Sequence, residues 1–317
     1  MFPDKRLKKM PREEQFELQP ELTGVALAYR NKNLIADEIF PTIPVDQKSF
    51  QYNFYNKESF LTVPETEIGE KGSANEALLK SKLLTETCKD YALKERIPVQ
   101  RLQEAQAKGK NIAADIILHL TDLMKLSREV RVAKALANKT VYGSNCKELT
   151  SSEKFTDDKV NAFKTLTTAM DKVLFRPNVL ITSRAGFSAL SQNPYVVSAV
   201  NSVDVKAGIA SAEGIKRTLG LEKILIGEGI VNTAAKGQAA SFNSCWSNDI
   251  ILMHINPIAT TDYGVTFGYR ATLDDYTVGS YHDPDAGTKG CDVYRIFTTY
   301  LDLLTCPECG YLLKGVA

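Results

Sequence analysis

The sequence predicts an α+β fold, and three observations support this prediction. The chain has 317 residues, 44% hydrophobic and 24% charged, which suffices to bury a substantial core in two domains or in one domain with extensions. Residues 111–138 carry the spacing of one long amphipathic helix. Residues 50–55 and 178–182 carry the alternating and the continuous apolar patterns of strands.

The clearest element is the helix predicted at 111–138. One face recurs every three or four residues, at Ile112, Ile116, Leu120, Leu123, Ser127 and Val130. The other side carries charges, at Asp115, Asp122, Lys125 and Glu129. At 1.5 Å per residue this helix would be roughly 40 Å long, more than a core helix needs. An ordinary helix of an α+β enzyme is one interpretation, and the rest of the chain favours a helix that braces an extended structure.

Charge and composition exclude several classes of protein. The formal net charge is +1 at pH 7, so the electrostatic drive for wrapping nucleic acid is missing. The apolar runs are too short to span a membrane, and residues 1–14 are too charged for a signal peptide. We therefore expect the protein to stay where it is made, with its six cysteines as free thiols.

The first residues predict an arm without a core of its own. Residues 1–20 are polar, and the basic cluster Lys5, Arg6, Lys8 and Lys9 is soon followed by Glu13, Glu14 and Glu17. A short helix is expected within Leu22–Ala36. Residues 40–45 should be stiff and extended along a surface, because Pro41 and Pro44 fix their own φ and restrain their neighbours.

A long hairpin is predicted next. Phe50, Tyr52 and Phe54 share one face of a strand whose partner should return from about Leu84 to Ile97. The connection 58–80 is polar and carries turn-forming glycine and proline. Because an isolated two-stranded hairpin is marginal in water, we expect it to lie on something else, such as another subunit.

The central part predicts two modules. In the first, a helix at 157–174 with Thr156 as N-cap is followed by the strand 178–182 and by a brief helix capped by Ser183. In the second, from Tyr195 onward, a helix at 212–219 accompanies strands at 223–226 and 250–254. Strands at 265–269, 277–281 and 292–303, the last two joined by the turn 283–290, should close the first module's sheet.

Motifs that carry chemistry are few. Cys306-Pro307-Glu308-Cys309 has the spacing of half a zinc site, but no second pair of ligands follows, so plain thiols are favoured over a metal and a redox role is weaker still. His119, His254 and His282 fit structural or surface positions better than a general base. The Ser183–Ser188 stretch is not a nucleophile elbow, Lys108–Asn111 is not a phosphate loop, and Asp274-Asp275 fits a solvated turn better than a cation site. We expect no catalytic residue and no cofactor.

The order of arm, hairpin, long helix, α+β module, inserted module and returning strands is characteristic, and local motifs accompany it. These are Phe40-Pro41, Ile43-Pro44-Val45, Cys88-Lys89-Asp90-Tyr91-Ala92-Leu93, Pro177-Asn178-Val179-Leu180-Ile181, Phe187, Leu190, Asn193, Pro194, Trp246, Asp249-Ile250-Ile251-Leu252, Phe267-Gly268-Tyr269 and Gly310-Tyr311-Leu312. Together they resemble the major capsid protein of tailed bacteriophages, the Hong Kong ninety-seven-like shell fold.

The resemblance implies a division of the chain. It comprises an N-terminal arm at 1–47, an extended loop at 48–98, a peripheral domain at 99–194 with its spine helix at 111–138, an axial domain at 195–258, and return strands of the peripheral domain at 259–317. The loop would lie across a neighbouring subunit, and the arm would clasp neighbours. Because only a short polar stretch precedes Leu22, either the chain is mature or a separate scaffolding protein serves it. By location alone, Lys57, Lys71 and Lys80 are candidates for a covalent cross-link.

The implied function is self-assembly, without catalysis, into hexamers and pentamers of an icosahedral shell around double-stranded DNA. The implied partners are further copies of the chain, a scaffolding protein, a portal and decoration proteins, with no sequence-specific DNA contact and no membrane. The protein would reside in the virion after assembly in the bacterial cytoplasm. Two alternatives remain: an encapsulin-like shell that carries cargo enzymes, and an α+β metalloenzyme built around Cys306 and Cys309.

Overall fold

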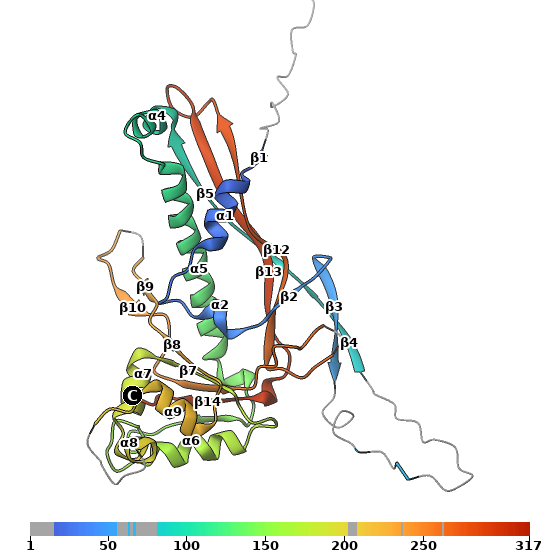
Figure 1. Cartoon of the computed structure of the whole chain (residues 1–317), viewed down its shortest axis with the longest axis vertical. Coiled ribbons are helices and arrows are strands. Elements are labelled where there is room, and N and C mark those ends of the chain that lie inside the picture. The colour runs from blue at the N-terminus through green and yellow to red at the C-terminus, as the bar shows by residue number, and fades with distance from the viewer. Residues whose placement is uncertain are drawn as a thin grey trace, which may run out of the picture. The chain divides into compact units, whose positions relative to one another are not determined.

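The computed structural model describes residues 16–55, 63, 66–67, 81–201, 208–235, 237–261 and 263–317 (Figure 1). The chain divides into two compact units. Unit 1 comprises Met1–Arg30, Asp90–Met124 and Asp274–Thr298, and unit 2 comprises Asn31–Lys89, Lys125–Leu273 and Thr299–Ala317. The basic cluster at 5–9 and the cross-link candidates Lys57, Lys71 and Lys80 lie outside the described residues.

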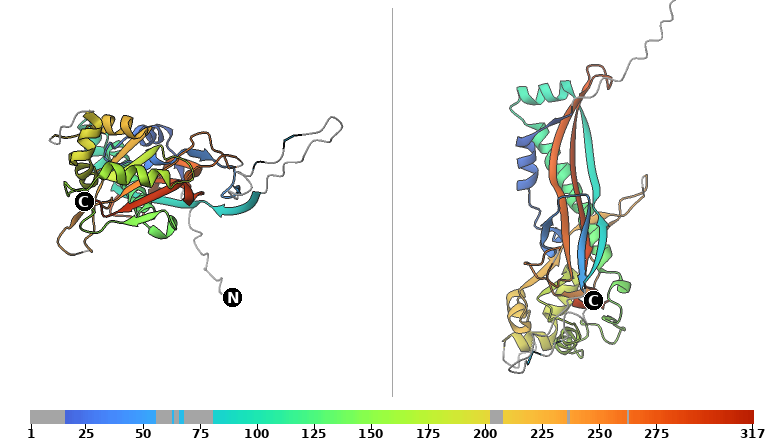
Figure 2. Two further views of the ribbon diagram at one scale, coloured as in Figure 1. Left: turned by 90° about the horizontal axis from the view of Figure 1, so that it is seen from below. Right: turned by 90° about the vertical axis from the view of Figure 1, so that its right-hand side faces the viewer.

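Unit 1 packs helices on one face of a sheet (Figure 2). The strand order is β1-β12-β13-β5, built from β1 (Glu17–Leu18), β12 (Gly268–Asp283), β13 (Cys291–Leu304) and β5 (Lys89–Pro98). Residues 268–273 of β12 and 299–304 of β13 belong to unit 2. The helices are α1 (Pro20–Ala28), α4 (Val99–Ala107) and the first half of α5 (Ile112–Leu136). The core that α1 and α5 share with β12 and β13 consists of Ala26, Ile117, Leu120, Met124, Tyr276, Val278 and Ile296.

Helix α5 confirms the long helix predicted at 111–138 to within two residues at each end. The placement of its charged residues was wrong in part. Lys125 is only 5% exposed and Glu129 is fully buried, because this half of the helix is surrounded by other elements of unit 2. Conversely, Leu123 of the predicted apolar face is 40% exposed. Periodicity found the helix, and tertiary packing decided which sides are covered.

Unit 2 is built on a second sheet with the strand order β6-β14-β11-β7-β8. The strands are β6 (Cys146–Glu148), β14 (Gly310–Lys314), β11 (Ile250–Met253), β7 (Val179–Ser183) and β8 (Lys223–Gly227). Strand β11 runs antiparallel to β14 and β7, whereas β7 and β8 are parallel. The accompanying helices are α6 (Ala162–Asp171), α7 (Arg184–Gln192), α8 (Pro194–Asn201) and α9 (Ala212–Leu219).

The predicted boundary between residues 194 and 195 falls inside this sheet. Strand β7 from the first predicted module pairs with β8 and β11 from the second. Their side chains also share one core, in which Leu166 and Leu180 lie in the same cluster as Val196 and Ile215. The two predicted modules are therefore joined by one sheet and one core.

The helices of unit 2 correct three details. Helix α6 is shorter than the predicted 157–174, and its N-cap is Asn161, whose side chain accepts a hydrogen bond of 2.9 Å from the backbone N–H of Lys164. Thr156 is not the cap, because Asp157 begins a turn in which the N–H of Val160 donates to its carbonyl. Helix α8 was missed. Pro194 was interpreted only as the end of α7, but it is also the first residue of α8, a position that suits proline. Ser183 does cap α7, accepting from the N–H of Gly186.

The C-terminal strands also differ from their prediction. Residues 265–269 and 277–281 belong largely to one strand, β12, in which Asp274 and Asp275 lie mid-strand instead of in a turn. Strands β12 and β13 pair with β1, β5 and the short β2 (Thr42–Pro44), not with β7. Strand β2 confirms the extended segment expected at 40–45, and it runs parallel to residues 270–272 of β12.

The hairpin is real but has a shorter partner strand. Strand β3 (Ser49–Tyr55) pairs with β4 (Ser81–Thr87), and the chain then enters β5 of the other sheet. The remaining short elements are α2 (Ala36–Ile39), the pair β9 (Ile230–Asn232) and β10 (Phe242–Ser244), and the turns η1 (Lys139–Val141) and η2 (Pro307–Cys309). Among the described residues, none of the helices combines the length and the apolar character that a bilayer crossing requires.

Candidate functional site

The base of the β3–β4 hairpin is anchored to its own unit by the aromatic face that its alternation predicted. Phe50 and Tyr52 are 7% and 6% exposed, and they pack with Tyr269, Ala271 and Leu303 of β12 and β13. The backbone N–H of Asn53 adds a hydrogen bond of 2.9 Å to the carbonyl of Thr261. This base is therefore held by its own chain and needs no second subunit.

The opposite face of the hairpin has no such cover among the described residues. Leu83 pairs with Asn53, points away from the Phe50 face, and is 55% exposed. Val63, beyond the strands, is 85% exposed. Most of the predicted tip, 59–80, lies outside the described residues. The described part thus presents an apolar side chain where a single two-stranded ribbon offers no core.

A second attachment holds the residues that follow the predicted arm. The ring of Phe16 lies under the guanidinium of Arg295, 4.1 Å from ring centroid to Cζ, and 6.2 Å from the ring of Phe297. Gly279 makes room for it, since a Cβ there would overlap the Phe16 ring. Residues 17–18 then pair with 279–280 of β12. The chain entering unit 1 is therefore fixed to the sheet edge from Phe16 onward.

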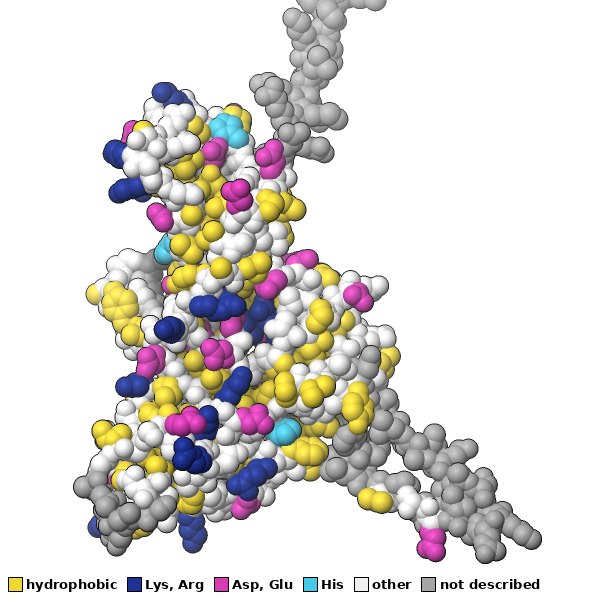
Figure 3. Space-filling model, viewed as in Figure 1, with side chains coloured by type: hydrophobic (Ala, Val, Ile, Leu, Met, Phe, Trp, Pro, Cys, Tyr) yellow, Lys and Arg dark blue, Asp and Glu magenta, His cyan; other side chains and the backbone are white. Residues whose placement is uncertain are grey.

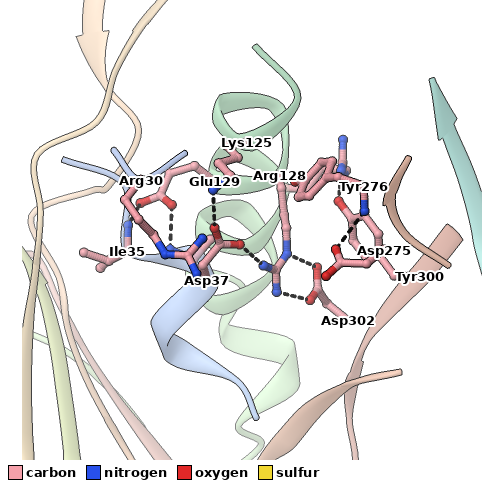
Figure 4. Close-up of polar contacts among 12 residues, drawn as sticks. Arg30, Ile35, Asp37, Lys125, Arg128, Glu129, Asp275, Tyr276, Tyr300 and Asp302 are labelled. Carbon is pink, nitrogen blue, oxygen red and sulfur yellow. Dashed lines mark hydrogen bonds and ion pairs between the residues drawn. The ribbon is translucent and has the colours of Figure 1, made fainter. Parts of the chain in front are cut away.

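Two charged clusters surround the second half of α5 (Figure 4). In the first, the Arg128 guanidinium, 1% exposed, lies between two carboxylates. Its Nη2 donates to Oδ1 of Asp302 at 2.7 Å, and its Nη1 donates to Oδ1 of Asp37. Lys125 Nζ lies 3.3 Å from the other oxygen of Asp37. We call Asp37, Lys125, Arg128 and Asp302 the Arg128 cluster.

The electrostatics of the Arg128 cluster favour its charged forms. Burial alone would lower the pKa of Arg128, but the carboxylates of Asp302 and Asp37 raise it above its ordinary value. Burial alone would raise the pKa of Asp37, but Arg128 and Lys125 outweigh it and hold that pKa below its usual range. The cluster therefore joins α5 to the start of α2 and to β13 by paired buried charges.

The second cluster centres on Glu129, which is fully buried. Its Oε1 accepts from the N–H of Ile35 at 3.1 Å and from Trp246 Nε1 at 2.6 Å, and its Oε2 accepts from the N–H of Ala36 at 2.7 Å. Burial raises the pKa of Glu129 even though these hydrogen bonds lower it. We call Glu129, Ile35, Ala36 and Trp246 the Glu129 cluster. Sequence reasoning missed it because its members are far apart along the chain.

The Arg128 and Glu129 clusters have a structural role: they connect segments of unit 2. Every ionised oxygen of Glu129 is occupied by a donor from its own chain, so no base is directed at an open cavity. Arg131 and Arg270 surround Tyr300 beside the Arg128 cluster, the first by a hydrogen bond to its hydroxyl and the second 4.4 Å from its ring centroid. The arrangement fixes α2 and β13 to α5.

The cysteine pair is brought together as its spacing suggested. Cys306 and Cys309 Sγ are 3.1 Å apart, on and beside η2, and all six cysteines of the chain are free. Within the described residues, no group of three or more His, Cys, Asp or Glu side chains is arranged to hold a metal ion. The pair therefore offers two of the four ligands that a structural zinc takes.

The other candidates take structural positions. His254 Nδ1 lies 3.1 Å from the carbonyl of Arg176, and His282 Nδ1 lies 2.8 Å from Asp292 Oδ1. His119 lies within α5. Asp275 Oδ1 accepts from the N–H of Tyr276. On the face seen in Figure 3, Lys and Arg side chains are interspersed with Asp and Glu, which matches the nearly neutral net charge.

Sequence relatives of the chain are phage proteins. It is 31% identical over 301 residues to the major capsid protein of Pseudomonas phage JBD67, with 95% of this chain and 97% of that protein covered. It is 24% identical over 313 residues to the major capsid protein of Burkholderia phage BcepMu, with 94% and 96% covered. No protein-family model matches the chain.

Solved structures share the fold. A phage-related protein from Bordetella bronchiseptica RB50 matches with a TM-score of 0.73 at 22% identity, covering 95% of this chain and 98% of that one. The capsid of a native GTA particle matches at 0.58 and 14% identity, with 92% of each chain covered. The SrpI encapsulin of Synechococcus elongatus PCC 7942 matches at 0.52 and 10% identity, covering 92% and 94%. The fold alone is therefore common to phage capsids and to encapsulins.

Proposed function

The chain belongs to the family of phage major capsid proteins, and from this premise we propose that its copies assemble as hexamers and pentamers into an icosahedral shell around double-stranded DNA. The observation that supports this best is the β3–β4 hairpin. Phe50 and Tyr52 of its aromatic face are buried on its own unit, while Phe54 of that face and Leu83 on the opposite face are 39% and 55% exposed. A surface of this kind suits contact with a neighbouring copy.

The parts of the chain take roles in this proposal. The extended loop 48–98 lies across a neighbouring subunit, and the arm that precedes Phe16 clasps neighbours from the point where unit 1 fixes it. The spine helix α5 and the long strands β12 and β13 serve as the peripheral domain. Residues 195–258, with the strands of unit 2 that they pair with, serve as the axial domain that meets its copies at fivefold and sixfold centres.

The remaining partners follow from the same role. The nearly neutral chain encloses DNA without sequence-specific contacts, because a formal net charge of only +1 gives little electrostatic drive for binding phosphates. A separate scaffolding protein, a portal and decoration proteins complete the particle. The chain has no catalytic role, and it reaches the virion after assembly in the bacterial cytoplasm.

An encapsulin-like compartment is the second candidate, favoured only by the shared fold. The phage role is better supported, because the relative at 31% identity is a phage major capsid protein. A metalloenzyme built around Cys306 and Cys309 is disfavoured, since the described residues bring no third ligand to the pair.

Electron microscopy of the purified recombinant chain tests the proposal. We expect closed shells, or capsomers that close when the chain is expressed with a scaffolding protein from the same genome. A species that remains at 35.1 kDa in sedimentation under all assembly conditions would contradict it. Shells that retain cellular enzymes and never package DNA during phage infection would favour the encapsulin-like role.

A further inference from the structure

Two thiols meet at the turn η2, and the shell role makes no use of them. Cys309 Sγ donates a hydrogen bond to Cys306 Sγ across 3.1 Å. The backbone holds the pair together, because the N–H of Cys309 donates to the carbonyl of Cys306 at 3.0 Å and Pro307 begins the turn between them. The backbone conformation of the turn therefore places the two sulfur atoms next to each other.

The two thiols face different surroundings. Cys306 is half-buried and lines an open pocket of about 530 Å³, together with Asn145, Lys172 and Glu308. Cys309 is fully buried behind it, in the core cluster that contains Phe267. A small molecule that enters the pocket therefore meets Cys306 first and cannot reach Cys309 directly.

The more accessible thiol, Cys306, is also the more acidic of the two. The hydrogen bond from Cys309 lowers the pKa of Cys306 against the effect of burial. The same hydrogen bond, together with burial, raises the pKa of Cys309. Because the thiolate is the nucleophile, the accessible sulfur is also the activated one.

We propose that Cys306 and Cys309 form a reactive dithiol, in which Cys306 attacks a small-molecule disulfide in the pocket and Cys309 resolves the product into an intramolecular Cys306–Cys309 disulfide. In the first step the Cys306 thiolate bonds to one sulfur of the small disulfide, whose other half leaves as a thiolate. That thiolate takes the proton of Cys309. The Cys309 thiolate then attacks the Cys306 sulfur and expels the second half, which takes up the proton that Cys306 had released.

Atoms and electrons balance in this thiol–disulfide exchange. The protein loses two hydrogen atoms and two electrons, and the small disulfide gains them as two thiols. The other half-buried thiols provide internal controls, because burial raises the pKa of both Cys146 and Cys245 and, in the part of the chain that the structure describes, both are free of disulfides. They should react slowly, and any adduct on them should persist.

The test treats the full-length, unassembled chain with bis(2-hydroxyethyl) disulfide, quenches with acid at intervals, and maps the cysteine peptides by mass spectrometry. We expect Cys306 and Cys309 to lose two hydrogen atoms together, without a retained adduct, on the order of tenfold faster than Cys146 or Cys245 gains one. An adduct that persists on Cys306 of the wild type, or equal rates at Cys306 and Cys146, would overturn the proposal.

Two variants assign the roles. In Cys309→Ser the mixed disulfide on Cys306 should form and remain, because the resolving thiol is gone. In Cys306→Ser the reaction at Cys309 should fall to the background seen at Cys245. A Cys306→Ser chain in which Cys309 reacts as fast as in the wild type would contradict the assignment. Circular dichroism checks that each variant folds, and Cys309→Ala replaces Cys309→Ser if serine is not accommodated, with persistence of the adduct on Cys306 as the readout.

Discussion

Trp246 Nε1 donates a hydrogen bond of 2.6 Å to Oε1 of Glu129, although the two residues are 117 positions apart in the chain. The same carboxylate accepts from the backbone N–H groups of Ile35 and Ala36, so two other segments of unit 2 are tied to α5 through one buried acid. A carboxylate in this position stabilises the fold only while its donors remain, because an unsatisfied buried charge is costly.

Replacing Trp246 with phenylalanine tests this convergence. The variant keeps an aromatic ring in the core but removes one donor, so we expect it to lower the free energy of unfolding by about 1–3 kcal/mol. Glu228→Gln is the matched control, since Glu228 is exposed and pairs with exposed Arg184, and we expect a change within about 0.5 kcal/mol. Chemical denaturation followed by circular dichroism measures both. A Trp246→Phe variant as stable as the control would show that the hydrogen bond contributes nothing.

The two clusters predict opposite dependences on pH. Burial raises the pKa of Glu129 above its ordinary value of 4.5, so the folded state binds this proton more tightly than the unfolded state. The contribution of Glu129 to the free energy of unfolding is therefore fully present below pH 4.5 and declines as the pH rises through its folded pKa.

Asp37 behaves in the reverse way. Arg128 and Lys125 overcome the effect of burial and lower its pKa, so its contribution is present above its ordinary value of 3.8 and is lost as the pH falls through its folded pKa. Denaturation of the wild type, Glu129→Gln and Asp37→Asn at a series of pH values gives the two contributions as differences. We expect them to change in opposite directions with pH, and slopes of the same sign would refute the assignment.

The Arg128 cluster predicts a large effect from one side chain. Arg128→Met retains much of the apolar stem but leaves Asp37 and Asp302 without their shared partner, so we expect a loss of about 3–5 kcal/mol in the free energy of unfolding. Arg184→Met is the control, because its pair with Glu228 is exposed and should contribute at most about 1 kcal/mol. Comparable losses of unfolding free energy in the two variants would show that the buried ion pairs of Arg128 contribute no more than the exposed pair of Arg184.

The sequence predicted the elements whose signals are local. Helices α5 and α9 lie where the sequence predicted helices, β7 is a short apolar run, and Ser183 caps α7 through a hydrogen bond within three residues. The clusters around Arg128 and Glu129 could not be predicted, because their partners are 91 to 174 positions distant and a buried charge on a helix looks like a solvated one.

Strand β12 illustrates the same limit for strands. Asp274 and Asp275 favour a turn when considered alone, yet the chain stays extended from Gly268 to Asp283, because β12 pairs with β13, and with β2 and β1 before and after these two residues. The hairpin was predicted from the sequence only in part. Alternation identified the buried face of Phe50 and Tyr52, whereas the change of sheet near Cys88 had no signal in the sequence.

The last prediction concerns the hairpin and the contacts between subunits. Deleting residues 59–80, which lie mostly outside the described residues, should leave the fold intact, because β3 and β4 are paired below the deletion and Phe50 and Tyr52 remain buried on β12. It should prevent closed shells, because the proposed contact with the neighbouring copy is removed. Thermal melting reports the fold, and electron microscopy reports the shells.

Point variants on the two faces of the hairpin separate assembly from stability. Leu83→Ser, on the exposed face, should melt within about 2 °C of the wild type, because Leu83 is already 55% exposed, and it should assemble poorly. Phe50→Ala, on the buried face, should lose about 3–5 kcal/mol of unfolding free energy. If the deletion and Leu83→Ser both form normal shells, the exposed face is not an intersubunit surface. If the deletion cannot fold at all, the loop belongs to the core of its own subunit, and the proposed role of the hairpin is wrong.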